Sequence, residues 1–255
     1  MASRNRDMDM CNGPLLGKML MFALPIMAMN ILQLLFNAAD MVVVGRFSGS
    51  EALAAVGATG PVINLIVNLF MGLSVGTSVI VAQDYGAGEW AEVSRSVHTS
   101  IAVSMLSGLI VTVAGLIFCR PLLRMMGTPA DIFSLSMLYT DIYFLGLPAS
   151  MVYNFGAAIL RAIGDSRRPM NFLIVTGILN VLLNLFFVIG LDMSVAGVAW
   201  ATVISQYLSM GLILLCLYKS DRAIRLVPRK LRIDGRKLKD SVRIGVPAGM
   251  QSLLF

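Results

Sequence analysis

The chain has 255 residues, of which 57% are hydrophobic and only 13% are charged, and its formal net charge is +6. Soluble domains carry about 25% charged residues, so this composition excludes an ordinary soluble domain and indicates an integral membrane protein. The excess of Lys and Arg does not indicate nucleic-acid binding, because it lies in connecting segments, where basic residues orient membrane helices.

Long apolar segments follow one another along the chain, separated by connections that are polar or contain Gly and Pro. A helix needs about 20 apolar residues to cross the hydrocarbon core, and continuous runs favour helices over the alternating strips of a barrel. We therefore expect an all-α integral membrane protein: a six-helix transmembrane bundle plus the start of a seventh helix. The expected helices cover 19–44, 53–81, 97–118, 136–160, 172–189 and 195–218, and the seventh begins near Ile244.

The distribution of basic residues predicts the orientation. Of the 20 Lys and Arg residues, all except Arg46, Arg120 and Arg124 fall on the side that holds the N-terminus. Cytoplasmic connections carry such an excess, so we expect a multi-pass protein of the plasma (inner) membrane with a cytoplasmic N-terminus. The expected divisions are a cytoplasmic tail at 1–18, a six-helix lobe at 19–218, a basic cytoplasmic linker at 219–243 and the start of a second lobe at 244–255.

A short internal similarity supports the last division. Residues 244–247 (IGVP) resemble residues 22–25 (FALP), and each stretch follows a basic residue. Many transporters are built from two repeats of membrane helices, with the substrate site at or between the halves. The chain is therefore expected to be one repeat plus the first turns of the next, and its expected partner is a C-terminal six-helix lobe.

The first apolar segment carries the most informative polar residues. Asn30, Gln33, Asn37 and Asp40 are spaced by three, four and three residues, which places them on one face of a helix. An ionisable group inside a membrane span is costly and usually functional, so this face is expected to line a polar cavity. The alternative is that Asp40 lies at the outer interface, since Gly45 follows closely.

Polar side chains also occur inside the other apolar segments. Buried amides in lipid need partners, so several helices that carry them indicate a shared interior with water or ligand. A single Asn can instead join two helices without lining a cavity. The residues are Asn64 and Asn68 in the second segment, Tyr143 and Asn154 in the fourth, Asn180 and Asn184 in the fifth, and Thr202 and Gln206 in the sixth.

Enzyme chemistry is not indicated. The sequence shows no Ser/His/Asp set, metal-ligand cluster or phosphate-binding Gly loop. The three cysteines lie in separate segments without metal-like spacing, and His98 is expected at the membrane interface. Because there is also no nucleotide-binding segment, transport would be driven by an ion gradient, with no cofactor beyond the coupling ion.

Short motifs in a fixed order mark the chain from the first segment to the sixth. They are 37–40 (NAAD) followed by Val44 and Gly45, 51–57 (EALAAVG), 83–88 (QDYGAG), 160–165 (LRAIGD), Asn180 and 195–202 (VAGVAWAT). Together they resemble the multidrug and toxic compound extrusion (MATE) family over essentially the whole chain. The resemblance implies a twelve-helix antiporter of two six-helix lobes, which exports organic cations or similar amphiphiles in exchange for inward Na⁺ or H⁺.

The resemblance also implies roles for individual residues. In relatives the acid that corresponds to Asp40 is central to ion coupling, and residues that match Asn154, Asn180 and Thr202 line the cavity of the N-terminal lobe. Some members have a second acid where this chain has Asn184. The sequence therefore places a single carboxylate in the cavity, which argues against a two-acid coupling scheme.

We predict an ion-coupling group of Asp40, Asn180 and Asn184. Amide and carboxylate oxygens suit a hard cation, and a Na⁺ ion would lie at Asp40 and Asn180. Small amphiphilic or cationic substrates and the lipid bilayer are the other expected partners. The predicted cavity-lining residues are Asn30, Gln33, Phe36, Asn37, Asn64, Asn68, Tyr143, Asn154, Thr202 and Gln206.

Two other functions stay open. A flippase for lipid-linked saccharides, from a related branch of the superfamily, would be expected to hold phosphates with Lys and Arg inside its spans, where this chain has none. The second is a non-transporting, half-length membrane protein that packs against a partner subunit.

Overall fold

The computed structural model describes residues 15–220 and 223–254, so most of the predicted tail at 1–18 lies outside the described residues, as does Cys11. The described chain is all-helical, as expected. Its elements are α1 (Leu15–Phe47), α2 (Gly49–Gly86), α3 (Trp90–Met125), α4 (Ala130–Ala162), α5 (Arg167–Leu185), the π-helical turn η1 (Phe186–Gly190), α6 (Ser194–Lys219), the 3-10 turn η2 (Pro228–Lys230) and α7 (Gly235–Leu254).

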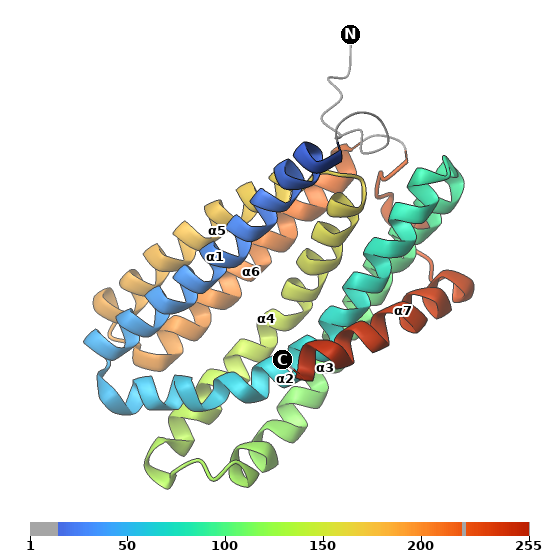
Figure 1. Ribbon diagram of the computed structural model, residues 1–255. Coiled ribbons are helices and arrows are strands. Elements are labelled where there is room, and N and C mark those ends of the chain that lie inside the picture. The colour runs from blue at the N-terminus through green and yellow to red at the C-terminus, as the bar shows by residue number, and fades with distance from the viewer. Residues whose placement is uncertain (1–14, 221–222, 255) are drawn as a thin grey trace.

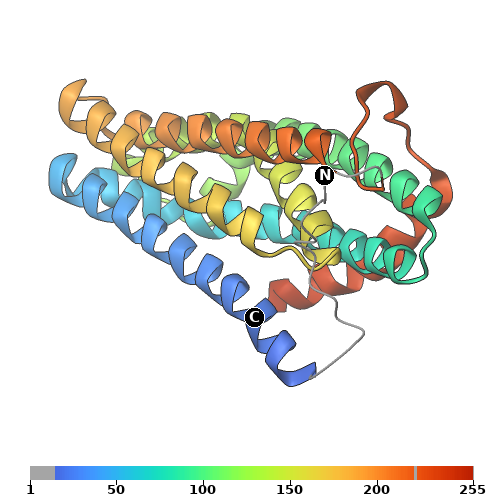
Figure 2. The same ribbon diagram turned by 90° about the horizontal axis from the view of Figure 1, so that it is seen from above.

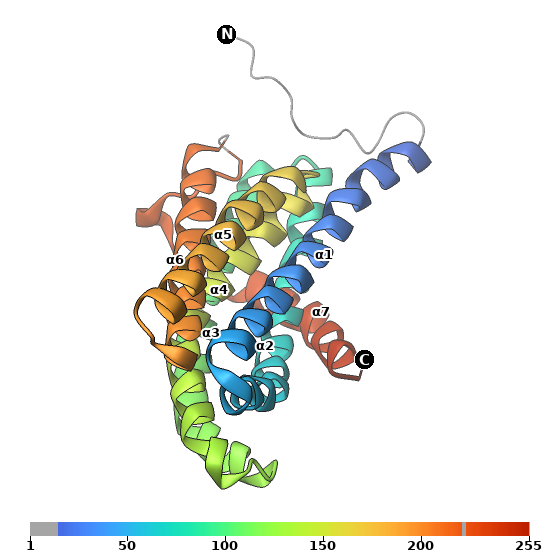
Figure 3. The same ribbon diagram turned by 90° about the vertical axis from the view of Figure 1, so that its left-hand side faces the viewer.

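The first six helices form one bundle. Helices α1, α5 and α6 pack together on one side and α2 and α3 on the other, and α4 joins the two groups because it packs against α2, α3 and α6 (Figure 1). Seen from above, α1 diverges from its neighbours toward its N-terminal end (Figure 2). Helix α7 crosses α2 at the side of the bundle (Figures 1 and 3).

The six predicted membrane spans correspond to α1–α6. Five of the described helices are long and apolar enough to cross a membrane, and α2 is the sixth if its two halves form one span. Helix α2 bends by 45° between Leu65 and Phe70, a feature that the sequence did not predict. Most of these helices extend beyond their apolar segments at both ends, whereas α5 ends at Leu185 and continues as the π-helical turn η1 to Gly190.

The outside of the bundle is apolar and the inside is closely packed. Leu24, Phe118 and Ile178 are each more than half exposed, as side chains that face lipid would be. Inside, α3 approaches α4 so closely that a Cβ added to Gly108 would lie 2.6 Å from the Cα of Pro148. Small residues at such crossings are typical of membrane bundles, where helices associate through close packing.

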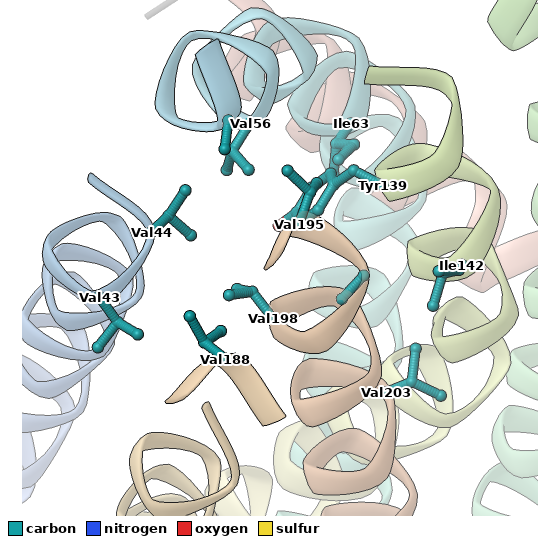
Figure 4. Close-up of a cluster of buried hydrophobic side chains, with 12 residues drawn as sticks. Val43, Val44, Val56, Ile63, Tyr139, Ile142, Val188, Val195, Val198 and Val203 are labelled. Carbon is teal, nitrogen blue, oxygen red and sulfur yellow. The ribbon is translucent and has the colours of Figure 1, made fainter. Parts of the chain in front are cut away.

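One hydrophobic cluster fixes α1 to the other helices near its C-terminal end. Val43 and Val44 of α1 meet Val188 of η1 and Val198 of α6 (Figure 4). Residues of α2 and α4, including Ile63 and Tyr139, complete the cluster. Because Asp40 lies one turn before Val43 and Val44, this cluster positions its carboxylate against α5 and α6.

The segment before α7 differs from the prediction in its length. The last helix begins at Gly235 and not near Ile244, so the linker is shorter than expected. Asp234 accepts hydrogen bonds from the backbone N–H groups of Arg236 and Lys237 at 2.9 and 3.3 Å, and these bonds lower the pKa of Asp234. This N-cap starts the helix within a polar stretch, which hydropathy does not reveal.

His98, expected at the membrane interface, is buried where α3 contacts the linker. Its Nδ1 lies 2.7 Å from the backbone oxygen of Ser94, and its Nε2 lies 3.0 Å from the backbone nitrogen of Val227. A neutral ring that donates from Nδ1 and accepts at Nε2 satisfies both contacts. His98 therefore anchors the linker to α3.

Candidate functional site

Four predicted polar residues from three helices meet near the C-terminal end of α1. Asn184 of α5 donates through Nδ2 to the carboxylate of Asp40 and, at 3.4 Å, to Oδ1 of Asn180. Asn180 donates to Oγ1 of Thr202 on α6 at 3.5 Å, and Thr202 donates to the backbone oxygen of Val198 at 3.0 Å. Asp40, Asn184, Asn180 and Thr202 form what we call the Asp40 network.

A close contact between α1 and α5 sets the register of this network. The ring of Phe36 lies directly on Gly177, where any added Cβ would overlap it. Phe36 is one turn before Asp40, and Gly177 lies on the same face of α5 as Asn180 and Asn184. Phe36, predicted to line the cavity, therefore packs α1 against α5 and holds the two polar faces opposite each other.

The Asp40 carboxylate is paired with a neutral amide instead of a cation. Asn184 is fully buried, Asn180 is buried and Asp40 is partly buried. Among the described residues, the basic partners of ion pairs are Arg95, Arg168 and Lys237, and Asp40 takes part in none of these pairs. The anionic form of Asp40 is therefore stabilised here by hydrogen bonding alone.

The network also contains an amide oxygen that accepts no hydrogen bond in the described structure. Oδ1 of Asn184 is buried and has no hydrogen-bond partner within the described part of the chain. An unsatisfied buried acceptor costs about 1–3 kcal/mol, so a group that binds it stabilises the site. Carboxylate, amide and hydroxyl oxygens together suit a hard cation, and the carboxylate alone can take up a proton.

Only Asp40 of the polar stripe on α1 reaches the network. Asn30, Gln33 and Asn37 are exposed, on a sector of the helix beside the face that packs against α5. The exposed apolar residues of α1, such as Ile31, lie on a different sector. The surface of α1 is thus divided into a polar and an apolar strip.

The remaining predicted cavity residues do not belong to the Asp40 network. Asn64 is exposed and Asn68 is partly buried on α2. Asn154 donates to the backbone oxygen of Ser150 in its own helix at 2.8 Å. Gln206 lies against Gly146 of α4, and its Oε1 is buried without a hydrogen-bond partner in the described structure.

Tyr143, a predicted cavity residue, packs against Tyr139, which the sequence analysis missed. Its ring stacks on Tyr139 with a centroid distance of 5.9 Å and an interplanar angle of 28°. Tyr139 belongs to the hydrophobic cluster that contains Val43 and Val44, and Tyr143 packs against the same cluster. The spacing of four residues between two tyrosines on α4 was the available signal for this pair.

A second carboxylate inside the predicted fourth span, Asp141, was also overlooked. It lies on the same face of α4 as Leu138 and Leu145, both of which are exposed. Asp141 itself is half-buried, and no hydrogen bond in the described structure joins it to the Asp40 network.

Comparison with known proteins identifies the family of this chain. The family model of MatE matches residues 25–186. The "Probable multidrug resistance protein YoeA" of Bacillus subtilis is 31% identical over 92% of the chain and 52% of the relative. The "Multidrug export protein MepA" of Staphylococcus aureus is 23% identical over 95% of the chain and 54% of the relative.

Solved structures agree with this result. "Crystal structure of MATE in the bent conformation" matches with a TM-score of 0.86 and 30% identity, over 92% of this chain and 53% of that one. An outward-facing multidrug resistance MATE family transporter matches with a TM-score of 0.84 and 31% identity, over 92% and 52%. The chain spans about half the length of the relatives it matches. It belongs to the MatE family of membrane transporters.

Proposed function

We propose that the protein is a secondary active antiporter that exports organic cations or amphiphilic drugs in exchange for Na⁺ or H⁺. Asp40 binds the coupling cation, and Asn180 and Asn184 assist it. The observation that carries the proposal is a carboxylate within a membrane helix that, among the described residues, has no basic partner and lies beside an amide oxygen without a hydrogen-bond partner. Relatives described as multidrug resistance and multidrug export proteins support the direction and the substrate class.

Two states of Asp40 have different consequences for α1. Without a cation, the carboxylate holds Asn184 of α5 through the hydrogen bond described above. A proton or Na⁺ on Asp40 weakens that bond, which loosens α1 from α5. Pro25 lies inside α1, where a missing N–H allows a helix to bend. Cation binding is thereby linked to movement of α1, and the membrane gradient of the cation drives the cycle.

The proposal requires a second lobe, because the chain spans about half of its relatives. The exposed polar strip of Asn30, Gln33 and Asn37 then faces a shared cavity and not lipid. Transporters similar to this chain have been described in outward-facing and in inward-facing conformations, which supports alternating access to such a cavity. In this arrangement the N-terminus and the linker lie in the cytoplasm, as the basic residues predict.

The test is efflux of the organic cation ethidium from cells or proteoliposomes that contain the protein, driven in separate arms by a Na⁺ gradient and by a pH gradient. Asp40→Asn should abolish efflux in whichever arm is active, while membrane insertion is unchanged. Asp141→Asn is the matched control, because it removes a carboxylate from a span but leaves the Asp40 network intact.

Undiminished efflux by Asp40→Asn would refute the coupling role. If the unmodified protein, together with a second lobe, exports nothing in either arm, the result favours the non-transporting alternative. Translocation of a lipid-linked saccharide instead of ethidium would favour the flippase. The positions of the basic residues argue against that outcome, since those in α1–α6 lie near helix ends.

A further inference from the structure

A second polar cluster lies at the other end of the bundle, where α2 ends and α7 begins. Nζ of Lys237 is 2.9 and 2.8 Å from the two carboxylate oxygens of Asp84 and 3.2 Å from Oε2 of Glu92. Ser96 donates to Asp84 at 2.7 Å. The side chains of Lys237 and Asp84 are each only 12% exposed. These four residues, Asp84 of α2, Glu92 and Ser96 of α3 and Lys237 of α7, are called the Lys237 cluster.

The chain before Lys237 is fixed to α3 as well. Thr99 donates to the backbone oxygen of Arg232 at 3.3 Å and accepts from the backbone nitrogen of Asp234 at 3.1 Å. His98 holds Val227 as described above. The first turn of α7 is therefore tied to the bundle mainly by polar contacts.

The rest of α7 is held by backbone proximity and not by buried apolar side chains. Gly72 and Gly76 of α2 lie directly against the α7 backbone around Gly245, where an added Cβ would collide. No α7 residue belongs to the three buried hydrophobic clusters of the described structure. Val246 and Met250 of α7 are exposed. Leu238 of α7 also lies beside Leu73 and Phe155 at a small cavity, so α7 covers some apolar surface, while the ion pairs fix its first turn.

We propose that the Lys237 cluster is a releasable latch that holds α7 closed over the ends of α2 and α3. The proposal rests on alternating access as set out under the proposed function: release of the latch opens the linker end of the transporter. Lys237 and Asp84 are positioning residues, because they touch neither the coupling ion nor the substrate. Burial alone would lower the pKa of Lys237, but hydrogen bonds to Asp84 and Glu92 raise it, so the latch is charged at neutral pH.

The test measures access to a site beneath α7 in the intact, membrane-inserted protein. Thr77 of α2 is 1% exposed and lines a small cavity together with Leu238 and Ser241 of α7. In a background without the native cysteines, Thr77→Cys serves as the reporter for a membrane-impermeant maleimide. Lys237→Met should raise the labelling rate at least about tenfold, which corresponds to about 1.4 kcal/mol of lost preference for the closed state.

Arg95→Met is the matched control. Arg95 also pairs with Glu92, at 2.8 Å, but it is 61% exposed and belongs to α3, so its loss removes one positive charge without releasing α7. Its labelling rate should stay within about twofold of the unmodified protein, as expected for an exposed pair. The exchanged pair Asp84→Lys with Lys237→Asp should restore slow labelling, which a merely damaged fold would not do.

An unchanged rate in Lys237→Met, or an equal rise in Arg95→Met, would overturn the latch. If Lys237→Met does not insert into the membrane, Asp84→Asn removes the same ion pair by changing its carboxylate, and the labelling rate of that variant tests the latch. Labelling does not require transport. A protein that fails the ethidium assay can therefore still show the latch, and the two proposals fail separately.

Discussion

Asp40 and Asp84 are both partly buried carboxylates, and they lie toward opposite ends of the same bundle. Asp84 is neutralised by Lys237 and receives a hydrogen bond from Ser96. Within the described part of the chain, the partner of Asp40 is the amide of Asn184. The two carboxylates thus differ in the charge of their partners more than in burial, which is why we propose that Asp84 joins helices and Asp40 exchanges a cation.

The largest effect is expected when Asp40 receives a permanent basic partner. Asn184→Lys would place an ammonium group beside the carboxylate and turn the Asp40 network into a copy of the Lys237 cluster. We expect complete loss of ion-driven ethidium efflux with normal insertion, because the ion pair occupies the exchange site. Efflux that persists with a Na⁺ or H⁺ dependence would contradict the role of the unpaired carboxylate.

A smaller change would separate α1 from α5 without adding charge. Gly177→Ala forces a methyl group into the ring of Phe36, so Asn184 moves away from Asp40. Overpacking of this kind costs about 1–3 kcal/mol, and we expect efflux to fall by about tenfold or more. Phe36→Leu in the same protein should restore part of the loss. Gly211→Ala, at a position with open space around it, is the control and should be neutral.

Removal of the Asn184 amide tests how much its hydrogen bond contributes to the state of Asp40. Asn184→Ala leaves Asp40 without its hydrogen-bond donor and removes the unused oxygen. Loss of a buried hydrogen bond to a charged group costs about 1.5–3 kcal/mol, so the concentration of Na⁺ or H⁺ that half-activates efflux should shift by about tenfold or more. The measurement is efflux against cation concentration, and an unaltered midpoint would remove Asn184 from the coupling group.

The smallest effect is expected at the edge of the Lys237 cluster. The exposed pair of Arg95 and Glu92 should contribute less than about 1 kcal/mol to folding stability. Thermal unfolding in detergent should therefore barely change in Arg95→Met, whereas Lys237→Met should lower the midpoint clearly. Equal effects of the two variants would show that burial and contact with α7 do not distinguish these pairs.

The sequence predicted the parts of the molecule that depend on periodicity and hydropathy. Six apolar segments gave the six helices, and the spacing of Asn180 and Asn184 placed both amides on one face of α5. Whether a face meets protein, lipid or a cavity depends on neighbouring helices, which is why Asn30, Gln33 and Asn37 were grouped with Asp40 although they remain exposed.

Contacts between distant segments could not be derived from local patterns. Lys237 was counted as one basic residue among many, because nothing near it in the sequence reveals Asp84 or Glu92. The early start of α7 depends on the Asp234 cap within a polar stretch, which a hydropathy criterion passes over. Motif 83–88 was recognised only as a family feature, and the structure assigns its aspartate a contact.

The bend in α2 lies between the Asp40 network and the Lys237 cluster, and α2 connects the two. The half before Leu65 contributes Val56 and Ile63 to the cluster that fixes α1, and the half after Phe70 ends at Asp84. Under the proposed movement of α1, we expect the upstream half of α2 to follow α1 while the downstream half stays in place. The bend between Leu65 and Phe70 would then be the hinge of the lobe, and stiffening it would decouple the two ends of the bundle.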